Sequence, residues 1–138
     1  MVRGIVARLA LATVIASSVL GVAGPTSVSA GVCTGKAGVY FTGAATRQAR
    51  GTAQVDNRCT PAKYDRACVV LWYTVPIGAK QAASKCVAIP TNTWVSFATG
   101  LVPCYAGYYF SQLTVYKSGV ALKQFDSPVY DGTGVCIN

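Results

Sequence analysis

The stretch Cys68-Val69-Val70-Leu71-Trp72-Tyr73-Thr74-Val75 decides the fold class of this chain, because Thr74 is its only polar residue and it contains neither Gly nor Pro. β-Branched and aromatic residues favour strands, and a run without polar alternation is typical of a strand covered on both faces. Asp65-Arg66 before it and Pro76-Ile77-Gly78 after it limit the run to strand length. We therefore predict a central strand here.

The chain around this strand is divided into short β-rich segments by Gly, Pro and Asn. Residues 79–85 are good helix formers and predict either a short helix or a plain connection. Lys117-Ser118-Gly119 predicts a three-residue hairpin loop with Gly119 in the left-handed conformation. The fold class is therefore predicted to be all-β, as a small disulfide-stapled antiparallel β-sandwich or barrel. The further strands are predicted at residues 39–41, 52–56, 85–89, 93–98, 104–116, 120–125 and 129–130.

Residues 1–30 have the three parts of a secretory signal. Two arginines near the start precede an apolar stretch from residue 9 to about 23, and Val28-Ser29-Ala30 supplies the small-residue ending. The apolar stretch is shorter than the roughly 20 residues that a spanning helix needs, so we expect cleavage after Ala30 and no membrane span. Residues 31–138 are then predicted to be a single secreted, extracellular β-domain.

The cysteines all follow the predicted cleavage site, and an even number in a small exported chain predicts disulfides. The sequence has no His and no Cys-x-x-Cys pair, so we expect no metal site and no cofactor. One pairing would close local loops by joining Cys59 to Cys68 and Cys86 to Cys104, which leaves Cys33 for Cys136, but sequence alone does not select it. The predicted disulfide cysteines are Cys33, Cys59, Cys68, Cys86, Cys104 and Cys136.

Positive charge is concentrated in the first third of the predicted mature chain. Ten of the 12 Lys and Arg residues follow residue 30, they face four Asp and no Glu, and six of them lie between Lys36 and Arg66. Such a segment suits an acidic partner protein or an anionic cell surface, rather than nucleic acid, outside the cell. The alternative is a cationic surface that only keeps the domain soluble. The candidate partner-binding residues are Arg47, Arg50, Arg58, Lys63, Arg66 and Tyr64.

The residue types disfavour the common hydrolytic sites. Without His, a Ser-His-Asp or Cys-His site cannot be assembled, and without Glu a carboxylate pair would need two Asp. All four Asp lie at or near turns, where carboxylates commonly accept hydrogen bonds from backbone amides. We therefore expect a protein that is not an enzyme. The four are Asp56, Asp65, Asp126 and Asp131.

Four tyrosines in and beside the 104–116 segment are a second candidate surface. Strand alternation places Tyr108 and Tyr116 on the side opposite to Tyr109. Tyr105, Tyr108, Tyr109 and Tyr116 would form either an exposed aromatic platform or, for at least half of them, part of the core.

These observations favour a non-enzymatic binding or adaptor module that docks to another exported protein with an acidic or aromatic-accepting surface. A secreted inhibitor of a protease or glycosidase is an alternative, with candidate loops at residues 76–85 and 99–103. A cationic cell-wall-binding or antimicrobial protein is a third class, although no long amphipathic helix is visible.

The signal ending Val28-Ser29-Ala30, the six-cysteine mature domain and the β-rich sequence that closes with Cys136 carry a resemblance to a known family. In overall plan the chain resembles the small exported adaptor subunit of the umbrella toxin particles of filamentous actinobacteria. That subunit joins a lectin subunit to a toxin-bearing stalk. The resemblance implies a place in a secreted antibacterial toxin complex and implies no particular contact residues.

Overall fold

The stretch around Leu71 is confirmed as a strand inside a sheet. In the computed structural model, which describes residues 33–138, β3 (Arg66–Val75) pairs with β4 (Gly78–Ala88) on one side and with β7 (Tyr108–Lys117) on the other. Apolar, β-branched residues suit such an inner position because both edges of the strand are hydrogen-bonded. The predicted signal peptide, residues 1–30, lies outside the described residues.

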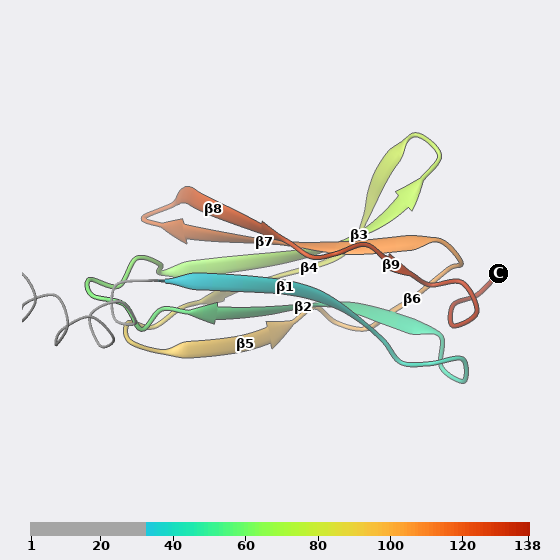
Figure 1. The fold of residues 1–138 in the computed structure, drawn as a ribbon, viewed down its shortest axis with the longest axis horizontal. Coiled ribbons are helices and arrows are strands. Elements are labelled where there is room, and N and C mark those ends of the chain that lie inside the picture. The colour runs from blue at the N-terminus through green and yellow to red at the C-terminus, as the bar shows by residue number, and fades with distance from the viewer. Residues whose placement is uncertain (1–32) are drawn as a thin grey trace, which may run out of the picture. The chain divides into compact units, whose positions relative to one another are not determined.

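The described residues form an antiparallel all-β sandwich and contain no helix. One sheet has the order β1-β2-β5, with β6 also paired to β2, and the other has the order β4-β3-β7-β8, with β9 paired to β7. Figure 1 shows the two sheets as layers. The remaining strands are β1 (Thr34–Phe41), β2 (Gln48–Asp56), β5 (Trp94–Ala98), β6 (Val102–Pro103), β8 (Val120–Asp126) and β9 (Tyr130–Asp131).

The core lies between the sheets because inward and outward residues alternate along β2, β3 and β7. Leu71, Leu113 and Val55 are among the largest fully buried side chains. At Gly51 the sheets approach so closely that a Cβ atom would lie 2.8 Å from Ser111 Oγ. The glycine therefore permits a spacing that any side chain would disturb.

The two ends of the sandwich carry different loops, and each end is named here by one residue. The Asn57 end consists of residues 57–65, 89–93 and 117–120, and the Tyr105 end consists of residues 42–47, 76–77, 99–107 and 132–138. In Figure 1 the Asn57 end is on the left and the Tyr105 end is on the right.

One part of the prediction for residues 68–75 is wrong, because only one face of β3 packs on the other sheet. The outer face carries Val70, which is half-buried, and Trp72, whose ring stacks on Phe110 with 6.4 Å between centroids. Cys68 also lies on this face, bonded to Cys86 on the neighbouring strand. The apolar run therefore reflects cover by neighbouring side chains of the same sheet.

The six predicted cysteines all form disulfides within the described residues, but the local pairing considered above is wrong. Cys68 faces outward on β3, whereas Cys59 is buried among core residues at the Asn57 end, so those two sulfurs cannot meet. Cys104 is likewise buried at the Tyr105 end, away from Cys86. The bridges are Cys33–Cys59, Cys68–Cys86 and Cys104–Cys136.

Two local predictions are also corrected. Residues 79–85 form part of β4 rather than a helix, because pairing with β3 outweighs their weak helical propensity. The loop between β7 and β8 has two residues rather than three, since Lys117 pairs with Val120. Ser118 and Gly119 have φ angles of 50° and 79°, and two positive φ values are what a tight type I′ hairpin requires.

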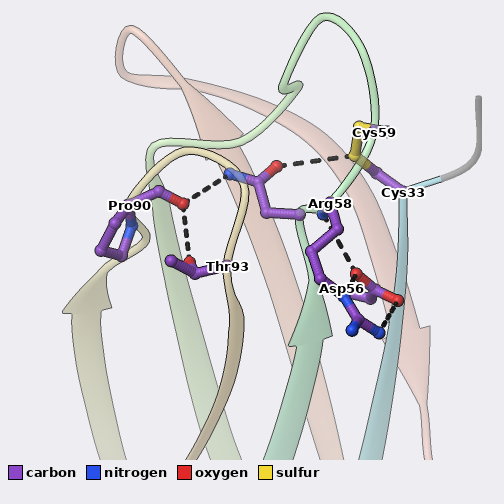
Figure 2. Close-up of polar contacts among 7 residues, drawn as sticks. Cys33, Asp56, Arg58, Cys59, Pro90 and Thr93 are labelled. Carbon is purple, nitrogen blue, oxygen red and sulfur yellow. Dashed lines mark hydrogen bonds and ion pairs between the residues drawn. A yellow bond between two sulfur atoms is a disulfide. The ribbon is translucent and has the colours of Figure 1, made fainter. Parts of the chain in front are cut away.

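Asn57 joins three segments at the Asn57 end. Its side-chain amide donates to Tyr64 O at 2.8 Å and to Pro90 O at 3.1 Å, and its Oδ1 accepts from Tyr64 N at 3.1 Å. Thr93 Oγ1 donates to the same Pro90 carbonyl (Figure 2). Cys33 Sγ lies 3.5 Å from Asn57 Oδ1, but a cystine sulfur carries no proton, so this contact is not a hydrogen bond.

Candidate functional site

The predicted basic residues do not form one patch. Arg47 lies in the turn before β2, and Arg50 is near the start of that strand. Arg58 and Lys63 lie in the loop after β2, and Arg66 begins β3. Because strand residues rise roughly 3.3 Å each, the length of β2 after Arg50 alone separates the two groups by about 20 Å. A single acidic surface patch would therefore not contact all five.

Two of these arginines are stacked on tyrosines on opposite outer faces. The Arg50 guanidinium lies 4.9 Å from the centroid of the Tyr40 ring on the β1–β2 sheet, and Arg66 lies 5.5 Å from that of Tyr116 on the β3–β7 sheet. In each pair the arginine and the tyrosine are directly opposite each other on neighbouring strands. Cation–π contacts of this kind are worth about 0.5–1 kcal/mol at exposed sites, so these arginines have a structural role.

Arg58 and Tyr64 are also engaged within the chain. The Arg58 guanidinium makes two 3.0 Å bonds to the Asp56 carboxylate, which hold the pKa of Asp56 below its usual range (Figure 2). Tyr64 is only 4% exposed and donates to Cys33 O at 3.3 Å. Burial raises the pKa of Tyr64. Tyr64 is therefore a core residue, and its prediction as a surface contact is corrected.

The four tyrosines predicted as platform or core are divided between the two roles. Tyr109 is 1% exposed, whereas Tyr105 and Tyr108 are each 53% exposed. Tyr116 is half-buried beneath Arg66. The alternation predicted for β7 is confirmed, and it leaves Tyr108 exposed at the start of the strand, close to the exposed Tyr105.

The β3–β4 hairpin has an irregularity that no sequence signal indicates. Leu71 pairs with Ala83 and Trp72 pairs with Gln81, so Ala82 is an extra residue in the ladder. Such a bulge bends the strand that contains it and increases its twist. The tip of the hairpin projects away from the sheets in Figure 1, and Ile77 at its turn is 95% exposed. The part of the hairpin beyond the bulge, called the arm below, thus carries a solvent-exposed apolar residue at its tip.

A groove of about 320 Å³ lies between this arm and residues 102–105. This volume is at the lower end of the range of roughly 300–1,000 Å³ for binding pockets. The two loops considered above for an inhibitor, residues 76–85 and 99–103, both contribute to its walls. The lining residues include Tyr73, Val75, Ala82, Val102, Pro103 and Tyr105.

Hydrogen bonds of two tyrosine hydroxyl groups hold the walls of the groove. Tyr73 Oη donates to Ala106 O at 3.0 Å, which ties the arm to the segment before β7. Tyr105 N donates to Tyr109 Oη at 2.8 Å, and burial raises the pKa of Tyr109. At Gly107, where φ is +146°, a Cβ atom would lie 2.7 Å from the Tyr73 ring. The groove is thus formed before any partner binds.

The groove is apolar, with one cation at its rim. Lys80 contributes to the lining, and no carboxylate does. Within residues 33–138 there is no cluster of His, Cys, Asp and Glu that could hold a metal ion. Among the same residues no helix is long and apolar enough to cross a membrane. Three disulfides indicate an extracellular or other oxidising compartment.

The chain matches no protein-family model, no curated protein and no solved structure in the comparisons made with each of these groups.

Proposed function

We propose that this chain is a secreted, non-enzymatic binding or adaptor module that docks to another exported protein through the Tyr105 end. The observation that carries the proposal is the projecting arm, whose tip residue Ile77 lies almost fully in solvent and whose residues Val75 and Ala82 line a preformed apolar groove. Exposed apolar and aromatic groups around a pocket are the usual anchors of a protein interface. The setting implied by the resemblance, a secreted toxin complex, fits a module of this kind.

The carboxylates support a role without catalysis. Asp65 Oδ2 accepts from Ser118 N and Asp126 Oδ1 from Gln124 Nε2, each at 2.8 Å. Asp131 accepts from Thr133, and the hydrogen bonds from that residue lower its pKa. With Asp56 paired to Arg58, each of the four carboxylates accepts a hydrogen bond from another residue of the chain. None of them lines the groove, where a catalytic acid would be needed.

Capture from culture supernatant of the producing organism tests the proposal. The tag should follow the predicted cleavage site, because Cys33 lies at the opposite end of the sandwich from the groove. We expect a specific partner that stays bound in 1 M salt, where the Debye length is only about 3 Å, because the contact is mainly apolar.

Matched variants locate the contact. Ile77→Asp places a charge at the arm tip and should weaken capture by about tenfold or more. Val120→Asp is the control, since Val120 is also an exposed apolar residue beside a hairpin turn but lies at the Asn57 end. A chain that purifies alone at every salt concentration, or equal losses for the two variants, would contradict the proposal.

The projecting arm also favours a second function, inhibition of a protease or glycosidase by insertion of the Pro76-Ile77 turn. Rigid exposed loops of this kind fill active-site clefts. A panel of secreted hydrolases distinguishes this function from the first. Competitive inhibition at micromolar concentration that is lost in Ile77→Asp would support it, and no inhibition would count against it.

A further inference from the structure

The edge of β4 offers backbone groups that no strand within residues 33–138 uses. β4 ends its sheet and pairs only with β3. Its Cys86 lies opposite Cys68 with Cα atoms 4.0 Å apart, a short spacing typical of a non-hydrogen-bonded pair. In such a pair the N–H and C=O groups point away from the partner strand. The amides and carbonyls of Ser84, Cys86 and Ala88 therefore point out from the free edge.

The hydrogen bonding at the end of β4 agrees with this assignment of which backbone groups point away from β3. Ile89 N donates to Asp65 O at 2.8 Å, so the backbone groups of the residue after Ala88 point toward β3. Alternation then requires those of Ala88 to point outward. The free segment lies on the far side of the Ala82 bulge from the arm, and Ser84, Cys86 and Ala88 in it are exposed.

The charged residues of β4 itself are two lysines, Lys80 and Lys85. Asp65 lies beside the Ala88 end of the strand, where its carboxylate accepts a hydrogen bond from Ser118 N. Lys85 pairs with Val69 and Lys80 pairs with Tyr73, so both lysines are on the side of the sheet that faces the core and the groove. β4 itself contains no carboxylate. Lysines on an edge strand hinder pairing with a second copy of the same positively charged edge. They do not hinder a negatively charged strand, and an opposite-charge cross-strand pair adds about 0.2–1 kcal/mol.

Resting on the proposed docking function, we propose that β4 receives an extended acidic segment of the partner protein as an additional strand. Its backbone pairs with Ser84, Cys86 and Ala88, its carboxylates lie beside Lys85 and Lys80, and one large apolar side chain enters the groove at Ala82. Backbone pairing supplies affinity in this mode of recognition, and alternate side chains supply specificity.

A designed heptapeptide tests this site directly. The probe is acetyl-Val-Thr-Glu-Thr-Phe-Thr-Glu-amide. As an antiparallel strand it places its first Glu beside Lys85 and its Phe beside Ala83, next to the groove residue Ala82. We expect amide chemical-shift changes in the full chain at Ser84, Cys86 and Ala88 on titration. The same peptide with Lys in place of both Glu should bind at least tenfold more weakly. In Lys85→Glu that preference should reverse, whereas in the control Lys117→Glu it should persist.

N-methylation separates strand addition from simple attraction to lysine. Methyl groups on the amides of the second and fourth peptide residues, which lie opposite Cys86 and Ser84, should abolish binding. Methyl groups on the third and fifth amides, which point to solvent, should leave most of the peptide binding intact. Equal effects of the two patterns, equal binding of the Glu and Lys peptides, or no shifts along β4 at millimolar peptide would overturn the strand-addition site. If Ile77→Asp still abolished partner capture in that event, the docking function would stand without it.

Discussion

Replacement of Asn57 is the change whose effect on the free energy of unfolding follows most directly from the structure. Asn57→Ala removes three hydrogen bonds and leaves Tyr64 N, Tyr64 O and Pro90 O without that partner. The Asn57 side chain is fully buried. At a net value of about 1 kcal/mol for each bond, the free energy of unfolding should fall by about 3 kcal/mol. For a domain of this size that corresponds to a melting temperature lower by roughly 12–24 °C.

Urea unfolding with the disulfides oxidised, followed by tryptophan fluorescence, measures this loss. Thr93→Ala is the matched control, since it removes an exposed bond to the same Pro90 carbonyl and should cost less than about 1 kcal/mol. Asn57→Asp keeps the Oδ1 acceptor but turns a carboxylate toward two carbonyl oxygens, so it should be at least as unstable at pH 7 and should recover in part when acid protonates the new group. A loss below about 1 kcal/mol in Asn57→Ala, with an unchanged m-value, would refute the role given to Asn57.

Three further predictions concern stability. Gly51→Ala should lower the free energy of unfolding by about 1–3 kcal/mol by pushing against Ser111 Oγ, and Ser111→Ala added to it should restore at least half, as urea midpoints would show. Because burial raises the pKa of Tyr64 and Tyr109, stability should be unaffected by these groups below about pH 10 and should fall as pH rises above it, when the unfolded chain ionises first. Melting curves from pH 8 to 11.5 test this, and a profile unchanged by Tyr109→Phe would contradict it. Replacing the Cys68–Cys86 pair by alanines should cost about 3 kcal/mol while the strand pairing persists, measured by thermal unfolding and circular dichroism.

The sequence predicts those parts of the fold that depend on local period. In β7 the alternation of buried Tyr109, Leu113 and Val115 with outward side chains follows from the two-residue repeat of a strand. The class is predicted for the same reason, since Gly, Pro and Asn divide the chain into strand-length runs.

The parts of the fold that depend on pairing between residues distant in the sequence cannot be predicted from local patterns. Residues 79–85 have the local composition of a helix, and only their pairing with β3 makes them a strand. One available signal is that Ile77 lies midway in the sequence between Cys68 and Cys86, as expected for two cysteines that face each other across a hairpin. The groove has no sequence signal, because it needs the Ala82 bulge and the approach of residues 102–105 to the arm.

The basic residues show a further limit. Their closeness in the sequence between Arg47 and Arg66 predicts one surface, yet β2 carries its residues from one end of the sandwich to the other and β3 belongs to the second sheet. Basic residues that are close in the sequence are therefore far apart in the folded domain. In a sandwich, a shared surface is better sought among residues at the same end of different strands.

The order of the three disulfides along the chain bears on how the protein is made. Cys33 bonds to Cys59, Cys68 to Cys86 and Cys104 to Cys136, so each cysteine is joined to the next one in sequence and no closed loop encloses or crosses another. A chain that emerges from its amino-terminal end can oxidise each pair as soon as its second member appears. Every native bridge is then also the first bridge available, and the protein should mature correctly with an oxidant alone, without an isomerase to exchange wrong pairs.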